Sequence, residues 1–183
     1  MKINLGSGKR FLKGYIHIDC QKYEHIQYIS QIDDLSFLES ESVDEIYSSH
    51  AFEYFDDVQA PIVLSEWRRV LKKEGKLRIS VPNFDALLKV YKITNDLGRI
   101  TGPLYGRWQN SSNVIYHRTC YNFNKLSKLL KESKFHSVET WDPFDFFNSI
   151  DPNYDDYSKA VYPHMDFKNG FQISLNIVAK KVS

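Results

Sequence analysis

The residues best placed to bind a ligand stand near the start of the chain, in "KINLGSGKRFLKGYIHIDC". Gly6-Ser7-Gly8 follows the short apolar run Lys2–Leu5, and a turn with almost no side chains lets a ligand approach main-chain N–H groups. An ordinary glycine turn has the same pattern. Asp19 closes the next run, Tyr15–Ile18, where aspartate also commonly caps a loop.

His50, directly after "VDEIYSS", is the titratable group of most interest. The unperturbed pKa of histidine, about 6.5, lets its imidazole accept a proton near neutral pH and so act as a general base. A histidine after a buried strand is also often just packed and hydrogen-bonded. Glu53, one helical step further on, could orient the ring of His50 or cap the helix that begins there.

These residues need a sheet to position them, and short apolar or β-branched runs predict one. The strand candidates within the first 82 residues are Lys2–Leu5, Tyr15–Ile18, Ile26–Ile29, "VDEIYSS" and "GKLRISVP". A helical stripe between the last two consists of Val63, Trp67, Val70 and Leu71. Pro61 suits its first turn and Gly75 its C-terminal stop. A strand, helix, strand unit of this kind pairs its strands in parallel.

The second half of the chain predicts one more helix and one more strand. In "NKLSKLLKESKF" the apolar face consists of Leu126, Leu129 and Leu130. Alternation in "GFQISLNIVAKKV" places on one side of a strand Phe171, Ile173, Leu175, Ile177 and Ala179. Alternating strands and helices indicate an α/β open sheet. The segments 96–122 and 142–169 do not fit this pattern, and loops of that length in a compact domain usually carry function.

Composition narrows the possible partners. The chain has 183 residues, which suits one domain, and 42% of them are hydrophobic, as in a packed globular protein. A net charge of +1 supplies no field that would attract nucleic acid or an anionic membrane, and "WRRVLKK" reads as the solvated face of its helix. No apolar run reaches the roughly 20 residues that cross a bilayer.

Cys20 and Cys120 match no metal-ligand spacing, and without a leader segment they indicate a reduced, cytoplasmic protein.

The motifs taken in order resemble the seven-stranded, class I S-adenosylmethionine-dependent methyltransferases. The pieces are "LGSG", "IDDLSFLESESVDEIYSSHAFEYF", "EWRRVLKKEGKLRISVPN" and "YNFNKLSKLLKESKF". They are most similar to a small branch with the pattern LGxG, acidic residue, DL, SxHxxEH, RVLxPGGxLRIxVP, well over residues 2–83 and loosely over 116–138. The resemblance implies a doubly wound, mostly parallel, seven-stranded sheet and S-adenosylmethionine as cofactor, with S-adenosylhomocysteine as product.

The resemblance also implies the cofactor residues. It places the methionine part over the backbone of Leu5, Gly6, Ser7 and Gly8. Asp19 would accept hydrogen bonds from both ribose hydroxyls, with Cys20 beside it.

At the adenine end, Asp34 would accept from the exocyclic amine and the Leu35 N–H would face the ring. Asp33 is adjacent, and Asp34 is preferred because it directly precedes Leu35. Ser49 and His50 would lie beside the sulfonium.

The acceptor side follows from the long segments. In the family, the segment after the fifth strand often overlies the reacting centre, which makes His117 a second catalytic candidate. The candidate substrate residues are Glu53 and three aromatic residues, Tyr105, Trp108 and Tyr116. The aromatic rings could exclude water or hold a sugar or planar ring. At least half of the aromatic residues could equally be core packing.

Several positions depart from the family pattern. Asn4 stands where the family often has an acidic residue, Arg10 where it often has a third glycine, and Tyr54 where the branch often has a second histidine. Only Lys9–Gly14 is available for the first helix, so we expect a turn there, and "EGK" keeps one glycine of a pair.

The sequence therefore predicts a single methyltransferase domain over residues 1–183, whose substrate side is formed by 96–122 and 142–169. Its acceptor would be a small polar molecule such as a saccharide or its precursor, with no metal required and the oligomeric state left open. Two alternatives remain, a degenerate cofactor-binding regulatory module and a nucleotide-dependent enzyme of another class. The dinucleotide fingerprint G-x-G-x-x-G fails because Phe11 stands at its third glycine.

Overall fold

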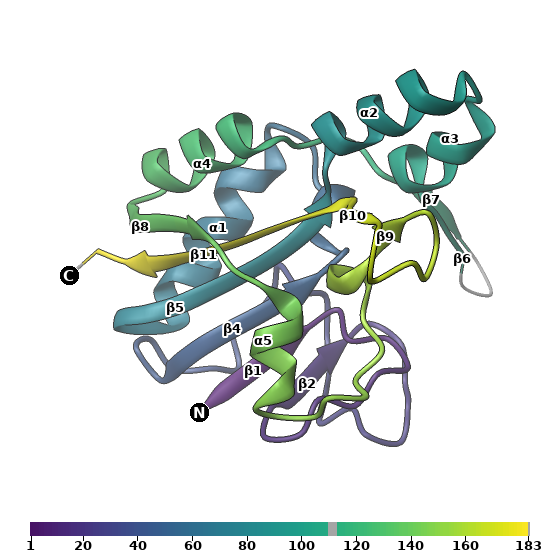
Figure 1. Cartoon of the computed structure of the whole chain (residues 1–183). Helices are drawn as coiled ribbons and strands as arrows, with labels where there is room; N and C mark the ends of the chain where they lie inside the picture. Colours follow the sequence, from purple (N-terminus) through teal and green to yellow (C-terminus); the bar gives the residue numbers. More distant parts are fainter. Residues whose placement is uncertain (110–112, 183) are drawn as a thin grey trace.

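The fold centres on one twisted sheet with helices on both faces (Figure 1). The computed structural model describes residues 1–109 and 113–182; residues 110–112, inside the predicted segment 96–122, and residue 183 lie outside the described residues. The seven strands have the order β3-β2-β1-β4-β5-β11-β8. They are β3 (Tyr28–Ile29), β2 (Ile16–Asp19), β1 (Lys2–Leu5), β4 (Val43–Ser49), β5 (Leu71–Pro82), β11 (Ser174–Lys181) and β8 (Phe135–Thr140).

The sheet is mostly parallel. The pairs β3-β2, β2-β1, β1-β4 and β4-β5 are parallel, and β11 runs antiparallel to both of its neighbours. The carboxyl ends of β1, β2, β4 and β5 therefore meet at one edge, where open α/β sheets bind their ligands. The α/β class and the mostly parallel seven-stranded sheet predicted from the sequence are confirmed.

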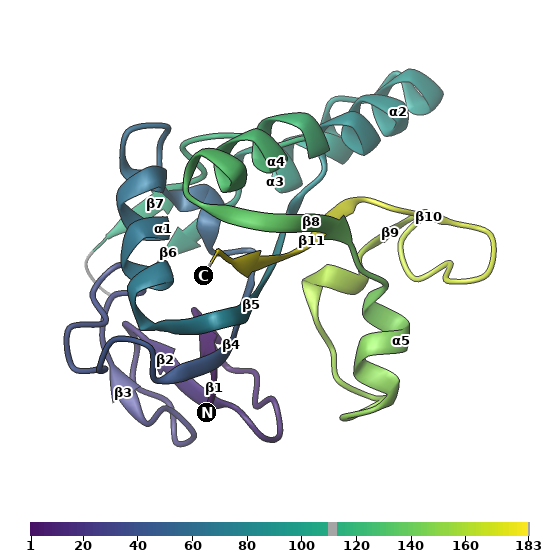
Figure 2. The same cartoon turned by 90° about the vertical axis from the view of Figure 1, so that its left-hand side faces the viewer.

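One face of the sheet carries a continuous apolar core under α1 (Gln59–Val70) and α4 (Phe123–Glu132) (Figure 2). The α1 side chains that face it are Ala60, Val63, Leu64, Trp67 and Val70. From α4, Leu126 and Leu130 are buried and Leu129 is partly buried, as the sequence predicted. The helix α1 ends at Val70, so Gly75 is not its C-terminal stop but lies within β5.

The opposite face has a thinner cover, α5 (Pro143–Asn148) and the turn η2 (Tyr157–Lys159). Its smaller core consists of Leu12, Tyr15, Tyr47, Trp141, Phe147 and Tyr154. Between β1 and β2 there is no helix, only a turn in which the Leu12 N–H donates to His17 Nε2 at 2.8 Å. This confirms the shortened first helix.

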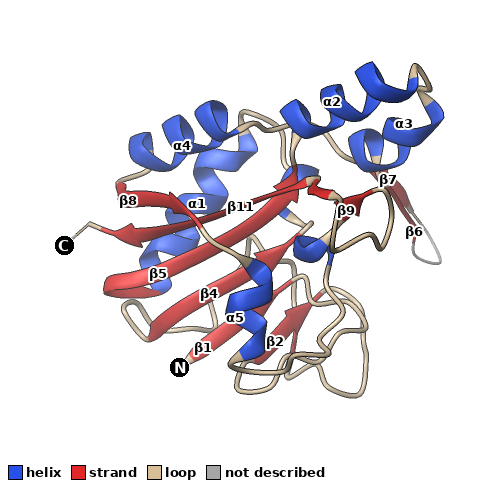
Figure 3. Cartoon of the chain, viewed as in Figure 1, coloured by secondary structure: helices blue, strands red, loops and turns tan. Residues whose placement is uncertain are grey.

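The two segments predicted as long loops contain regular structure (Figure 3). The first holds α3 (Gly98–Tyr105) and the hairpin of β6 (Arg107–Gln109) and β7 (Val114–Tyr116). The second holds α5, η2 and β9 (Val161–Tyr162), which pairs with β10 (Phe171–Gln172). Their helices have eight and six residues, which is too short for an apolar face to repeat over several turns and be recognised in the sequence.

Three further elements differ from the sequence prediction. The helix α2 (Phe84–Thr94) was not predicted, and neither was β8. The predicted strand 26–29 is reduced to Tyr28–Ile29. Phe171 and Ile173 precede β11 and pack instead with Leu87 of α2 and Ile100 of α3. Among the described residues, no helix has both the length and the apolar character to cross a bilayer.

Candidate active site

The glycine turn after β1 has the conformation that its sequence predicts. Gly6 and Gly8 have φ angles of +70° and +55°, in the left-handed region that favours glycine. A Cβ on Gly6 would lie 2.8 Å from Ala51 Cβ, whereas a Cβ on Gly8 would have nothing within 4 Å. Ser7 Oγ is buried and has no hydrogen-bond partner among the described residues. The turn thus presents open space and an unsatisfied hydroxyl.

Asp19, at the end of β2, already caps this turn. Its Oδ2 accepts from the Gly8 N–H at 2.8 Å, and its Oδ1 accepts from the Gln21 N–H at 2.8 Å. Each carboxylate oxygen can accept more than one hydrogen bond, so the cap leaves acceptor capacity for a ligand. Cys20 follows and is not part of a disulfide. Partial burial of its thiol, together with the charge of Asp19, raises the pKa of Cys20.

The residues predicted at the adenine end are partly engaged elsewhere. The side chain of Asp34 is exposed, and its Oδ1 accepts from the Ser36 N–H, which lowers the pKa of Asp34. The Leu35 N–H donates to Glu66 Oε1 at 3.1 Å. Ile32 lies nearer to the glycine turn, with its Cγ2 3.9 Å from the position of a Cβ on Gly6. No local pattern marks Ile32, because an isolated apolar residue between polar ones carries no signal for binding.

Ser49, at the end of β4, is held by a residue far away in the chain. Its hydroxyl donates to Asp156 Oδ1 at 2.7 Å, as does the Tyr47 hydroxyl at 2.8 Å. Asp156 immediately precedes η2 and lies in the segment 142–169. This contact joins the predicted substrate side to the carboxyl end of the sheet.

His50 begins the next turn with strained backbone geometry. Its φ is +52°, which is uncommon for a residue other than glycine and a reason to suspect function. The Ser174 hydroxyl donates its one hydrogen to Tyr157 O at 2.6 Å, so it accepts from His50 Nε2 at 2.7 Å. In the neutral ring, this leaves Nδ1 of His50 without a hydrogen.

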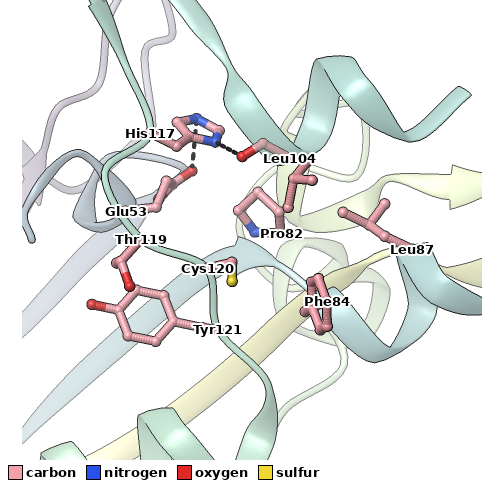
Figure 4. A pocket seen from close by; sticks show the side chains of 9 residues that line it. All are labelled: Glu53, Pro82, Phe84, Leu87, Leu104, His117, Thr119, Cys120 and Tyr121. Carbon is pink, nitrogen blue, oxygen red and sulfur yellow. Dashed lines mark hydrogen bonds and ion pairs between the residues drawn. The ribbon is translucent and has the colours of Figure 1, made fainter. Parts of the chain in front are cut away.

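The side chain of His117, from the segment after α3, lies near Glu53, as does that of His50. Its Nδ1 lies 3.3 Å from Leu104 O, and because a carbonyl only accepts, Nδ1 carries the hydrogen (Figure 4). Gly106 makes room for this ring, because a Cβ there would lie 2.0 Å from His117 Nε2. The two histidines predicted as catalytic are therefore brought together.

Glu53 lies between the two imidazoles. Its Oε1 is 3.6 Å from His50 Nδ1 and 3.5 Å from His117 Nε2, the nitrogens without hydrogens. The residue is 1% exposed, and neither carboxyl oxygen has a hydrogen-bond partner among the described residues. Glu53 does not cap a helix, since the residue at that position is Ala51.

Burial shifts the proton affinities of this cluster, defined as His50, Glu53 and His117. It raises the pKa of Glu53 to about 8. It lowers the pKa of His50 to about 4, against the opposing charge of Asp156, and it also lowers the pKa of His117. At neutral pH the cluster therefore holds a protonated carboxyl and two neutral rings. Strongly perturbed groups gathered in one place are typical of functional sites.

A small pocket adjoins the cluster (Figure 4). Its lining residues are Glu53, Pro82, Phe84, Leu87, Leu104, His117, Thr119, Cys120 and Tyr121. Most of these residues are apolar. Glu53 and His117 belong both to this lining and to the cluster, so they connect the pocket to the titratable groups. No group of three or more histidine, cysteine or acidic side chains among the described residues is arranged to hold a metal ion.

The predicted aromatic substrate residues lie outside this pocket. Tyr105 and Tyr116 are 58% and 50% exposed, and Trp108 is half-buried in the β6-β7 hairpin. Closer to the cluster is Tyr157, whose ring centroid lies 5.3 Å from that of His50. Arg10 lies over the Tyr157 ring at 4.4 Å. No local pattern marks Tyr157, because its place beside His50 depends on the return of a segment from far along the chain.

Comparisons with known proteins concern the fold and the type of domain. A family model described as a methyltransferase domain matches residues 16–79. No curated protein sequence matches the chain. A SAM-dependent methyltransferase from Archaeoglobus fulgidus has a TM-score of 0.56 at 14% identity, covering 98% of this chain and 85% of that chain.

A second solved structure is the 1,6-didemethyltoxoflavin-N1-methyltransferase of Burkholderia thailandensis, with 1,6-didemethyltoxoflavin and S-adenosylhomocysteine bound. It has a TM-score of 0.55 at 11% identity, covering 100% of this chain and 71% of that chain. Identities this low establish the fold, and the family model supplies the activity class. The chain therefore has the fold of class I methyltransferases, and its residues 16–79 match a methyltransferase domain, which indicates S-adenosylmethionine-dependent methyl transfer.

Proposed function

We propose that this methyltransferase modifies an oxygen or nitrogen of a small polar acceptor, and that the acceptor's proton passes to the cluster of His50, Glu53 and His117. One observation carries the proposal. A carboxyl group that is 1% exposed, with no hydrogen bond to either oxygen, lies within 3.6 Å of two bare imidazole nitrogens beside a pocket. Buried polar groups without partners are costly, so such a group is usually kept for a function.

The residues of the carboxyl edge fit the cofactor. Gly8 leaves open space over the turn, Ser7 Oγ lacks a partner, and Asp19 retains acceptor capacity for ribose hydroxyls. When bound, S-adenosylmethionine supplies a methyl group already activated on a sulfonium sulfur. The protein then mainly has to align the acceptor and exclude water. Ile32, beside the turn, is proposed to contact the adenine in addition to Asp34 and Leu35.

The protein residues supply a place for the proton. An acceptor hydroxyl or amine must lose a proton during or after methylation, and a base within reach assists this loss. With Glu53 protonated, the cluster carries no net charge. Once Glu53 has lost its proton, the cluster is negatively charged, so it can accept the proton of the substrate without creating a buried positive charge. Because the pKa of Glu53 is about 8, methyl transfer is expected to rise with pH through that value.

The substrate side is proposed to consist of the described parts of 96–122 and 142–169 within a single domain of residues 1–183. The polar and aromatic side chains there, with Tyr157 beside His50, suit a saccharide or its precursor. The cytoplasmic location and the absence of a nucleic-acid partner, both expected from the sequence, stay predictions.

The test is an acceptor screen. The protein is incubated with S-adenosylmethionine and separate panels of sugars, small hydroxyl compounds, amines and short nucleic acids, and formation of S-adenosylhomocysteine is measured. We expect turnover with a small polar compound and none with nucleic acid. Tight binding of S-adenosylhomocysteine without turnover on any panel would instead favour a regulatory cofactor-binding module.

A further inference from the structure

Two opposite charges, Arg10 after the glycine turn and Asp156 beside the end of β4, interact electrostatically, and no ion pair joins them among the described residues. They come from opposite ends of the chain. Arg10 follows the turn itself, and its N–H donates to Ser7 O at 3.1 Å. Asp156 is joined to the end of β4 through Ser49. Both charges act on the pKa of His50, which Asp156 raises and Arg10 lowers, but neither residue belongs to the proton-accepting cluster.

Asp156 is anchored through one oxygen. Its Oδ1 accepts from the Tyr47 hydroxyl at 2.8 Å, the Ser49 hydroxyl at 2.7 Å and the Ser158 N–H at 2.7 Å. Its Oδ2 accepts no hydrogen bond from the described residues. A carboxylate that is 6% exposed, with one oxygen saturated and the other free, is a fixed negative charge that retains capacity for a donor.

Arg10 is held in a similar way. Its Nε donates to Asp155 O at 2.7 Å, and its guanidinium lies 4.4 Å over the Tyr157 ring. Burial of the guanidinium lowers the pKa of Arg10. The hydrogen bond with Tyr157 and the charges of Asp156 and Asp155 outweigh this effect of burial, so the pKa is raised overall. A guanidinium has five N–H donors in a fixed geometry, so the bond to Asp155 leaves donors for a planar anion.

Their position relative to the sheet indicates what they could bind. Leu5, the last residue before the turn, is paired with Ser48, and Ser49 contacts Asp156. The two charges therefore flank the turn over which the methionine part of the cofactor is proposed to lie. That part is an α-amino acid, with a carboxylate and an ammonium on one carbon. A site for such a zwitterion needs one cation and one anion close together.

We propose that Arg10 and Asp156 form a clamp for the amino-acid end of the cofactor, Arg10 binding its carboxylate and Asp156 its ammonium. The inference rests on the cofactor assignment and adds residues that neither the family model, which matches 16–79, nor the motif resemblance assigns. The negative charge comes from the far end of the chain, while Asn4 in the first strand is neutral.

The experiment compares two probes by calorimetric titration. S-Adenosylhomocysteine carries the amino-acid end, and 5′-methylthioadenosine lacks it. Arg10→Gln and Asp156→Asn should each weaken binding of S-adenosylhomocysteine by about tenfold to a hundredfold and leave binding of 5′-methylthioadenosine within about threefold of wild type. Asp156→Asn keeps an oxygen for Ser49 and Tyr47, and Arg10 lies on the surface turn, so one of the two variants can be assayed even if the other is unstable.

The controls are Lys9→Gln and Asp145→Asn, which make the same changes of net charge on exposed side chains. They should bind both probes as wild type does. Equal losses for both probes, or no loss for either, would overturn the clamp. If wild type binds 5′-methylthioadenosine and S-adenosylhomocysteine equally well, the clamp is also wrong while the cofactor site stands. If wild type binds neither, the cofactor assignment itself fails.

Discussion

The two halves of the carboxyl edge are built in different ways. In the cofactor half, Gly6, Asp19 and Ser49 each stand where a strand ends, so consecutive strands bring them together. In the acceptor half, His117 arrives from a segment that leaves the sheet and returns. The first half therefore depends mainly on the order of the strands, with Asp156 as the residue that reaches it from far along the chain, whereas the second depends on contacts between residues far apart in the chain.

The chemistry of the halves differs accordingly. The cofactor half offers backbone N–H groups, hydroxyls and a carboxylate that caps its own turn. The acceptor half concentrates buried titratable groups, and its pocket is mostly apolar. If this division is correct, substitutions in one half should leave the function of the other half intact.

The largest effect is expected at Glu53. Glu53→Gln keeps the shape of the side chain but removes its proton exchange, so the turnover number should fall by about a hundredfold or more, the usual range for loss of general base catalysis. Affinity for S-adenosylhomocysteine should stay within about threefold of wild type. Steady-state kinetics and calorimetry on the same preparation measure both, with the exposed Glu24→Gln as control. A variant that retains wild-type turnover would remove Glu53 from the reaction.

The next effect is expected at Gly106, which contacts only the acceptor half. Its φ is +43°, and a Cβ would lie 2.0 Å from His117 Nε2, so Gly106→Ala must displace the ring. We expect turnover to fall by roughly tenfold to a hundredfold, as for small misplacements of catalytic groups, with cofactor affinity unchanged. Gly14→Ala, at φ +85° with open space around it, is the control for backbone strain alone. Equal effects of the two substitutions would show that strain, not His117, is responsible.

Asp19 tests the cofactor half from two sides. Asp19→Ala removes the acceptor for the Gly8 and Gln21 N–H groups, so the unliganded protein should lose about 1 kcal/mol of stability, as for a lost cap. If Asp19 also binds the ribose, affinity for S-adenosylhomocysteine should fall by about tenfold or more, and less in Asp19→Asn. Lower stability with affinity unchanged would leave Asp19 a loop cap only.

The smallest effect is a dependence of stability on pH. The pKa of Glu53 is about 8 in the folded protein and 4.5 ordinarily, so the folded state holds this proton longer and the free energy of unfolding falls as pH rises between these values. His50, with a pKa lowered to about 4, has the opposite effect up to about its ordinary value of 6.5. Urea unfolding at several pH values from 6.5 to 8 should show a decline that Glu53→Gln reduces. An unchanged slope in that variant would contradict the burial argument for Glu53.

The cofactor half was largely predictable from the sequence, because each of its elements has a local signal. Apolar runs marked β1, β2 and β4, and the glycine pair marked a turn that φ angles of +70° and +55° confirm. The apolar stripe that includes Trp67 predicted α1, because the residues of a buried helix face repeat at helical spacing.

The acceptor half was less predictable for a physical reason. His50 and His117 were singled out by residue type, but nothing local to Asp156 or Tyr157 indicates that they return to the end of β4. The helix α3 and the short α5 are held by tertiary contacts rather than by a strong apolar stripe. At the adenine end, the exposure of Asp34 and the bond from Leu35 to Glu66 depend on the packing of α1, which sequence motifs do not report.

The most direct test of the division is one calorimetric series with S-adenosylhomocysteine against wild type, Gly8→Asn, Gly14→Asn and Glu53→Gln. Asparagine tolerates a positive φ, and both glycines have open space around them, so the pair differs mainly in whether the added side chain lies over the proposed cofactor. We predict binding to wild type, Gly14→Asn and Glu53→Gln with affinities within about threefold, and at least about a tenfold loss in Gly8→Asn. No binding to wild type at millimolar ligand, or a loss in Glu53→Gln as large as that in Gly8→Asn, would contradict a cofactor site built independently of the acceptor site.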